Sequence, residues 1–175
     1  MSKILAILIV IITLLLTGVG EVYAENVSGG SAELVAVSAG SDFDFRVENL
    51  RNFFQKYNSP LAPYAKEFVI YADENDLDYR LVPAITGVES TFGKRIPAKS
   101  YNAYGWANGE YSFTSWEDSI EHVSKVLKRS YIDRGAVSIY QIAKRYAPPS
   151  TTWGGKVSFF VSKIDTLPLD FDIVI

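Results

Sequence analysis

Cysteine is absent from the 175-residue sequence, and histidine occurs only once. Without cysteine no disulfide can form, so packing alone must hold the fold together. The single His122 has no neighbour that would make it a metal ligand, and we expect it at the surface or at the edge of the core. A Gly-rich phosphate loop, an internal repeat and a metal-type cluster are also missing. We therefore expect no metal and no cofactor.

Positive charge is scarce as well. The formal net charge is -3, and no basic stretch stands out that would indicate a nucleic-acid-binding surface. Lys125, Lys128 and Arg129 lie close together, but on a helix they are typical of a solvated face. We expect a monomer with no nucleic-acid partner.

No apolar run reaches the ~20 residues that a membrane-spanning helix needs. The run Ile4–Leu16 follows a short positive start, contains 13 residues and is interrupted only by Thr13. Val22 and Ala24 then stand at the spacing that a signal peptidase requires. We therefore predict a signal peptide over residues 1–24 and a secreted or cell-surface protein. The alternative is an uncleaved segment that anchors the protein to the membrane.

The remaining chain divides into a linker, one domain and a tail. Residues 25–44 are rich in Gly, Ser and Ala without a sustained period, which is typical of a flexible linker. Residues 45–167 are long enough for one domain with a core of its own. The tail, residues 168–175, has no assigned structure.

Apolar residues at helical spacing predict a mainly α domain of about six helices. Two of them open with capping boxes, Thr114 to Glu117 and Ser138 to Gln141. Pro63 is placed to begin the second helix, and Pro83 fits the first turn of the third. Gly93 is the expected left-handed stop of that third helix.

One short stretch has a different pattern. In "YNAYGWANGEYSF", residues 101–113, aromatic residues alternate on both sides of Asn108-Gly109. This arrangement predicts a small β-hairpin, with Tyr104 and Trp106 on one face of their strand. The fold class is therefore mainly α with one hairpin.

Glu89 stands among apolar residues near the C-terminal end of the third predicted helix. The helix dipole disfavours a negative charge there by a few tenths to ~1 kcal/mol, and burial would disfavour it further. Both effects raise the pKa, which suits a carboxylic acid that protonates the leaving oxygen of a sugar. The alternative is an exposed Glu near a helix end, an ordinary residue without a catalytic role.

Three segments, "GVESTFGKRIP", "YNAYGW" and "KRYAPPSTTWGGKV", together resemble the bacterial endo-β-N-acetylglucosaminidase domain of cell-wall hydrolases. The family's Glu-Ser-x-x-Gly, Asn-x-aromatic-Gly and Tyr-Ala motifs are similar to Glu89 to Gly93, Asn102 to Gly105 and Tyr146-Ala147, followed by Trp153. The resemblance implies a lysozyme-like α+β fold, peptidoglycan as substrate and Glu89 as catalytic acid.

The resemblance also implies roles for several other residues. Tyr146 would be a second catalytic residue, whose phenol hydrogen-bonds the substrate near the reacting carbon. The segment that lines the sugar cleft corresponds to Tyr101, Asn102, Tyr104 and Trp106. Their aromatic rings suit stacking on sugar faces. Tyr146 can equally be a core residue on the stripe with Ile139 and Ile142, and the sequence does not fix which hairpin rings face the cleft.

A second catalytic carboxylate is not identified. The family often has Thr-Asp after its Tyr-Ala pair, but Pro148 and Pro149 follow here. Glu110 is better explained as a solvated turn residue and Asp118 as a favourable charge at a helix start.

Three functions are compatible with these features. The first is an exported glycosidase that cuts β-1,4 bonds of peptidoglycan with Glu89 as general acid. The second is a lytic transglycosylase that uses the same Glu89 first as acid and then as base. The third is a non-catalytic glycan-binding module. With a net negative charge, binding would depend on contacts in the cleft rather than on long-range attraction to anionic wall polymers.

Overall fold

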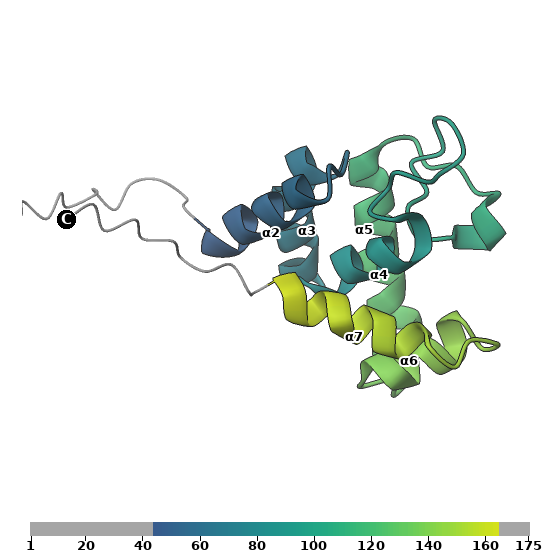
Figure 1. Ribbon diagram of the computed structural model, residues 1–175. Helices are drawn as coiled ribbons and strands as arrows, with labels where there is room; N and C mark the ends of the chain where they lie inside the picture. The colour runs from purple at the N-terminus through teal and green to yellow at the C-terminus, as the bar shows by residue number, and fades with distance from the viewer. Residues whose placement is uncertain (1–43, 165–175) are drawn as a thin grey trace, which may run out of the picture. The chain divides into compact units, whose positions relative to one another are not determined.

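Six α-helices make up most of residues 44–164, the part of the chain that the computed structural model describes (Figure 1). The predicted mainly α fold is confirmed. The predicted signal peptide, most of the linker and the tail lie outside the described residues. The α-helices are α2 (Phe45–Lys56), α3 (Ala65–Glu74), α4 (Leu81–Ser90), α5 (Trp116–Val126), α6 (Ile139–Tyr146) and α7 (Trp153–Ile164).

Shorter helical segments connect these elements. A 3-10 turn, Ala62–Tyr64, contains Pro63 and leads into α3. A π-helical turn, Leu127–Ile132, extends α5, and a second 3-10 turn covers Trp106–Gly109. No helix within residues 44–164 is long and apolar enough to cross a membrane.

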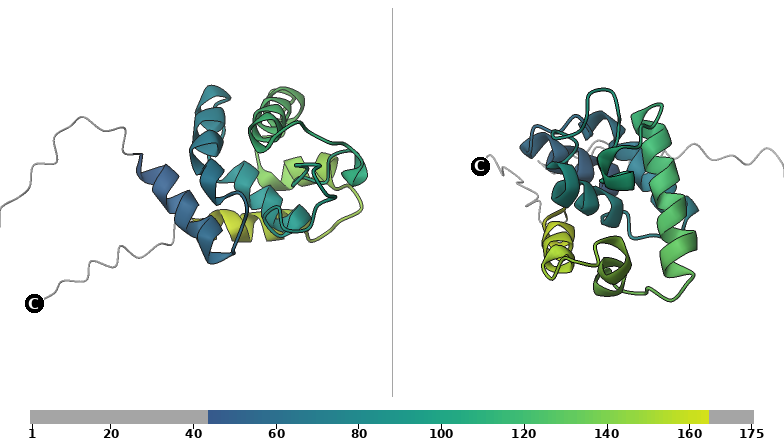
Figure 2. Two further views of the ribbon diagram at one scale, coloured as in Figure 1. Left: turned by 90° about the horizontal axis from the view of Figure 1, so that it is seen from above. Right: turned by 90° about the vertical axis from the view of Figure 1, so that its right-hand side faces the viewer.

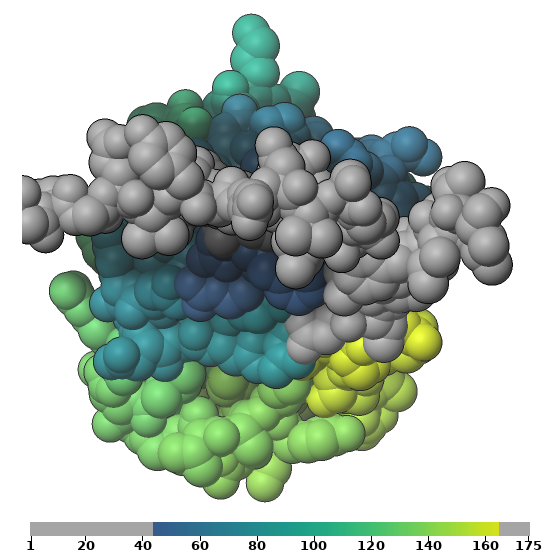
Figure 3. All heavy atoms as spheres, turned by 90° about the vertical axis from the view of Figure 1, so that its left-hand side faces the viewer, coloured from purple at the N-terminus to yellow at the C-terminus, as the bar shows by residue number. Residues whose placement is uncertain are grey.

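Helix α4 lies at the centre of the domain. It packs against α7 and α5, α2 packs against α3, and α3 against α5 (Figures 1 and 2). Helices α6 and α7 also pack together. From the α2 side of the domain, Figure 3 shows α7 in yellow beside the light-green region that contains α6.

Side-chain caps open α5 and α6, with one shift from the prediction. Ser138 caps α6 as predicted, because its Oγ accepts a hydrogen bond from the Gln141 N–H at 3.3 Å. The predicted Thr114 cap of α5 is wrong. Ser115 is the N-cap, and its Oγ accepts from the Asp118 N–H at 3.1 Å. The Asp118 carboxylate in turn accepts from the backbone N–H and hydroxyl of Thr114, which leaves Thr114 outside the helix.

The end of α4 is a turn of three consecutive left-handed residues. Gly93 is left-handed as predicted, but the helix ends before it, because the left-handed backbone begins earlier, with φ of 54° at Thr91, 59° at Phe92 and 75° at Gly93. The Phe92 N–H donates to the Thr86 carbonyl at 2.9 Å, and the Gly93 N–H donates to Ser90 Oγ at 2.8 Å. These bonds close the helix two residues sooner than the glycine alone would.

This turn places the Phe92 ring in the middle of the core, where only 1% of the residue is exposed. Its ring centroid lies 4.4 Å from that of Tyr57, 4.9 Å from Phe160 and 5.4 Å from Phe53. Phe92 therefore joins α2, α7 and the end of α4 in one aromatic cluster. The burial of that ring offsets the strain of its left-handed backbone.

The predicted hairpin over residues 101–113 is wrong, and residues 44–164 contain no β-strand. The side chain of Asn102 connects the two arms in place of a ladder of backbone bonds. Its amide nitrogen donates to the carbonyls of Trp106 and Tyr111, each at 2.9 Å, and its oxygen accepts from the Trp106 N–H at 3.0 Å. With Ala107 and Asn108 also left-handed, the segment coils into a loop rather than extending.

Gly93 tests the three-residue turn. A Cβ there would lie 3.1 Å from the Trp116 ring and 3.4 Å from Leu61, on a left-handed backbone. We expect Gly93→Ala to lower the free energy of unfolding by roughly 2–4 kcal/mol, the sum of backbone strain and overpacking.

The matched control is Gly135→Ala. Gly135 has φ of 88° but open space around its Cβ position, so we expect only the backbone effect of ~1–2 kcal/mol. Urea denaturation of both variants measures the difference. Equal losses would contradict the close packing at Gly93.

Candidate functional site

The last turn of α4 carries Glu89, whose carboxylate faces the beginning of α7. Glu89 Oε1 accepts a hydrogen bond from the indole N–H of Trp153 at 2.6 Å. Trp153 is the first residue of α7 and is almost completely buried. The site therefore forms where the end of α4, the start of α7 and the loop of residues 91–115 meet, and the three converge on one side of the domain in Figures 1 and 2.

The environment of Glu89 favours its neutral form. Burial raises the pKa of its carboxyl group above the ordinary value of 4.5, and the hydrogen bond from Trp153 offsets part of this rise. The raised pKa agrees in direction with the sequence-based expectation, and its cause is burial. Glu89 is thus a partly buried carboxyl group with one oxygen held in place by Trp153.

A cavity of about 400 Å³ opens beside this carboxyl group. Its walls come from the end of α4 and the loop that follows. Besides Glu89, the lining residues that matter most for its chemistry are Arg95, Asn102, Gly105 and Asn108. The cavity therefore combines a carboxylic acid, a guanidinium group and backbone amides.

A second cavity, of about 280 Å³, adjoins the first, because Gly105 and Asn108 line both. Its other walls include Trp106, Tyr131 and Tyr146. Together the two cavities form a recess, called here the Glu89 groove, with the acid on one side and aromatic residues on the other. Such a mixture of rings and a few polar groups is typical of carbohydrate-sized ligand sites.

Gly105 makes room for the carboxylate. A Cβ at this position would lie 2.8 Å from Glu89 Oε2, and the backbone has φ of 66°. Both facts favour glycine. Because Gly105 has no side chain, it leaves the space that the Glu89 carboxylate occupies.

Tyr146, at the end of α6, connects the loop to the start of α7. Its hydroxyl donates to the Tyr104 carbonyl at 2.7 Å, and its ring stacks on Trp153 with centroids 4.9 Å apart. Burial, and then the nearby Glu89 charge, raises the pKa of the Tyr146 phenol. Tyr146 thus lies next to Glu89, as predicted, but its proton is engaged by the backbone. We interpret it as a positioning residue.

The predicted sugar-contacting residues differ in how far they are available to a ligand. Trp106 lines the groove and packs edge-on against His122, with ring centroids 5.4 Å apart. Tyr104 also lines the second cavity, but the residue is completely buried and its ring offers no exposed face for stacking. Asn102 lines the Glu89 cavity, yet its amide is occupied by the loop bonds described above.

Tyr101 also differs from the expectation. Its ring packs edge-on against Trp116 at 5.4 Å and lines neither of the two cavities. The reason is the missing hairpin, since alternation of side chains between two faces requires an extended strand.

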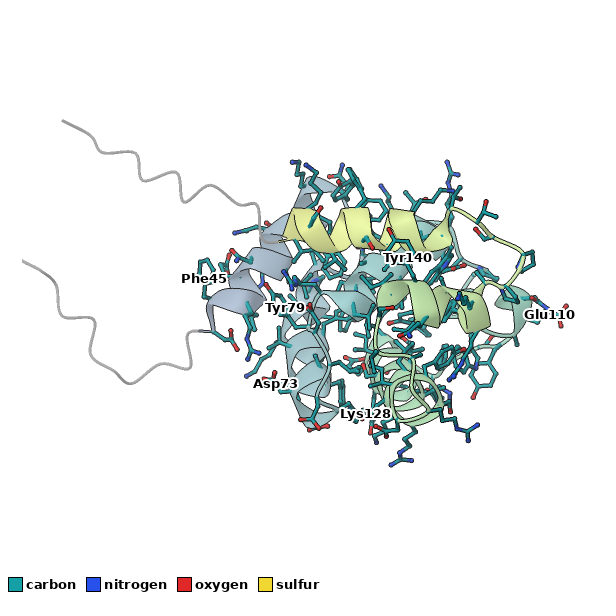
Figure 4. The ribbon with its side chains drawn as sticks, turned by 90° about the horizontal axis from the view of Figure 1, so that it is seen from below. Phe45, Asp73, Tyr79, Glu110, Lys128 and Tyr140 are labelled. Atoms are coloured by element: carbon teal, nitrogen blue, oxygen red, sulfur yellow. The ribbon has the colours of Figure 1, made fainter. Side chains whose placement is uncertain are left out.

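The two other candidate acids, Glu110 and Asp118, do not line the Glu89 groove. Glu110 is exposed and extends from the edge of the domain in Figure 4. Asp118 lies in the first turn of α5, and its bonds from Thr114 lower the pKa of its carboxyl group. His122 lies at the core edge among the rings of Trp106, Tyr111 and Phe113, which agrees with its predicted position. Among the described residues, no group of three His, Cys, Asp or Glu could hold a metal ion.

A further cavity of about 630 Å³ lies along α7. Tyr140 of α6 and Phe159 of α7 contribute exposed rings to it, and Lys156 contributes a cation. Figure 4 shows Tyr140 between α6 and α7. This surface is separate from the carboxyl group of Glu89, which does not line it.

The charge of the described residues differs from that of the whole chain. Residues 44–164 contain sixteen Lys and Arg against thirteen Asp and Glu, whereas the chain as a whole has a net charge of -3. The excess of acidic residues therefore lies in the sequence before and after the helices. The expectation that the groove lacks long-range attraction for anions followed from the chain average and does not apply to the helical part.

Two residues of the site were not predicted from the sequence. Trp153 belongs to the family resemblance, but nothing in the sequence indicates that its indole N–H binds Glu89, 64 residues away. Arg95 follows the Glu-Ser-x-x-Gly motif by two residues, so its proximity to Glu89 in sequence was the available signal.

No known protein family model matches the chain, and no curated protein sequence matches it either.

The raised pKa of Glu89 predicts a pH dependence of stability. The folded state holds this proton more tightly than the unfolded state, so the contribution of Glu89 is most favourable below pH ~4.3 and is lost as pH rises through the folded pKa. Glu89→Gln keeps an acceptor for Trp153 but carries no charge. We expect the variant to gain thermal stability relative to the wild type as pH increases across this window.

Thermal melts of both proteins between pH 3.5 and 8 measure this difference. Subtracting the two curves cancels the other titrating groups. Parallel curves, or a wild type that gains on the variant as pH rises, would contradict the raised pKa.

Proposed function

We propose that this protein is an exported glycosidase that cleaves β-1,4 bonds of peptidoglycan with Glu89 as general acid. The observation that carries the proposal is the position of Glu89, a partly buried carboxyl group held by Trp153 at the wall of a groove with aromatic residues. The resemblance in the Glu-Ser-x-x-Gly, Asn-x-aromatic-Gly and Tyr-Ala motifs indicates the substrate class. Export rests on the apolar segment near the N-terminus.

The two oxygens of Glu89 have different surroundings. Oε1 accepts from the indole N–H, so a proton on that oxygen would compete with the donor. Oε2 faces Gly105 and has no hydrogen-bond partner among the described residues. The acidic proton therefore belongs on Oε2, from which it can pass to the glycosidic oxygen as the bond to the sugar carbon breaks.

Among the described residues that line its cavity, Glu89 is the only one with a carboxylate. Glycosidases that use two carboxylates place them ~5–5.5 Å or ~6.5–9.5 Å apart. A site with one carboxylate needs a nucleophile from another source, and the substrate can provide it. This observation favours a second candidate, a lytic transglycosylase.

In that reaction Glu89 first protonates the leaving oxygen and is left as a carboxylate. It then accepts the proton of a hydroxyl group of the same sugar, whose oxygen bonds to the anomeric carbon. The product is an anhydro-sugar end that is lighter by one water than the product of hydrolysis. Glu89 returns to its protonated state in both reactions.

Digestion of purified peptidoglycan tests the proposal. We expect Glu89→Gln to fold normally and to lose activity by ~100-fold or more, the scale for removal of a general acid. Glu110→Gln is the matched control, because it makes the same chemical change at an exposed position and should retain full activity. The masses of the released fragments distinguish hydrolysis from anhydro-product formation.

Full turnover by Glu89→Gln would contradict the role of Glu89. A non-catalytic binding module predicts a different result, in which neither the wild type nor Glu89→Gln cuts the glycan and both bind it equally.

A further inference from the structure

Arg95 lines the same cavity as Glu89, and its side chain has no partner among the residues that the structure describes. Its guanidinium group makes no hydrogen bond or ion pair with any residue of the described chain. Arg46 and Arg51, by contrast, are bound by carboxylates, those of Asp73 and Glu48. Arg95 is thus a cation that lines the groove and is not neutralised by any residue from 44 to 164.

A backbone hydrogen bond fixes the position of the Arg95 main chain. The Arg95 N–H donates to the Ser90 carbonyl at 2.9 Å, directly after the left-handed turn that ends α4. Ser90 is in turn tied to Ala103 across the loop, through its hydroxyl at 2.8 Å. Glu89 and Arg95 therefore lie on either side of the left-handed turn, and the bonds of Ser90 connect that turn to the loop.

Glu89 does not serve as the counter-ion. The two side chains form no ion pair, and the pKa of Glu89 is raised by burial without an opposing effect from Arg95. A guanidinium close enough to pair with this carboxyl would lower its pKa and remove the proton that the reaction needs. The site keeps the acid and the cation apart within one cavity.

We propose that Arg95 forms a subsite for a carboxylate carried by the substrate, next to the bond that Glu89 cleaves. The guanidinium fork can donate two parallel hydrogen bonds to a carboxylate, which a neutral sugar does not provide. The inference rests on the proposed glycosidase function and adds a charge requirement to it. The positive balance of residues 44–164 is consistent with an anionic ligand.

In peptidoglycan this carboxylate has two sources. One is the lactyl group on the muramic sugar, which is a free acid once the peptide is removed, and the other is the peptide stem. Three substrates separate them: intact peptidoglycan, glycan strands freed of peptides by an amidase, and neutral β-1,4 oligomers of N-acetylglucosamine. The first carries peptide carboxylates, the second lactyl carboxylates and the third neither.

The test compares Arg95→Gln with Arg129→Gln. Both remove one positive charge from an exposed side chain, but Arg129 lies on the π-helical turn and does not line the groove. We expect Arg95→Gln to lower kcat/KM by about tenfold or more on one or both carboxylate-bearing substrates. On neutral oligomers it should match the wild type, and Arg129→Gln should match it on all three. Arg95→Lys, which keeps the charge without the fork, should fall between.

The pattern of losses identifies the source. A loss on intact peptidoglycan alone indicates the stem peptide, and a loss on peptide-free strands indicates the lactyl group. Equal rates for Arg95→Gln and wild type on all substrates would overturn the subsite while leaving the role of Glu89 intact. So would a loss of the same size on neutral oligomers, or an equal loss in Arg129→Gln.

Binding measurements keep the two proposals distinguishable. Calorimetric titration of the wild type and Arg95→Gln with peptide-free strands and with neutral oligomers needs no turnover. If the wild type cuts no substrate, the glycosidase proposal fails, and the titration still decides whether Arg95 selects an anionic glycan. Equal affinities of both proteins for both ligands would then overturn the subsite.

Discussion

The hydrogen bond between the Trp153 indole and Glu89 is the interaction on which the candidate site depends. It joins the end of α4 to the start of α7 and selects one oxygen of the carboxyl group for the proton. Tyr146 supports it from the other side by stacking on Trp153 and by holding the loop at Tyr104. These three contacts therefore hold both the Glu89 carboxyl group and the wall of the groove in position.

The left-handed turn after α4 is the backbone feature that makes this geometry possible. It buries Phe92 in the aromatic core, which fixes the helix end, and it directs the following chain past Arg95 into the Asn102 loop. Core packing and site geometry are therefore coupled through one turn. Residues with strained backbones often cluster at functional sites for this reason.

The sequence predicted the helices because their apolar periodicity, caps and prolines act locally. The same local signals identified Glu89 and the direction of its pKa shift. The hairpin prediction failed because alternation and Asn-Gly do not reveal that a buried amide, Asn102, would bind both arms. The partners of Glu89 depend on contacts between distant segments, so Trp153 and the burial of Tyr104 could not be predicted from spacing.

A titration of the Glu89 side-chain carboxyl group by ¹³C NMR tests the central claim most directly, with Glu89→Gln used to assign the signal. The account predicts a pKa above the ordinary value of 4.5, because the carboxyl group is partly buried in the groove wall. A pKa at or below 4.5 would mean that the group is a hydrated anion near neutral pH. That result would contradict its role as a proton donor.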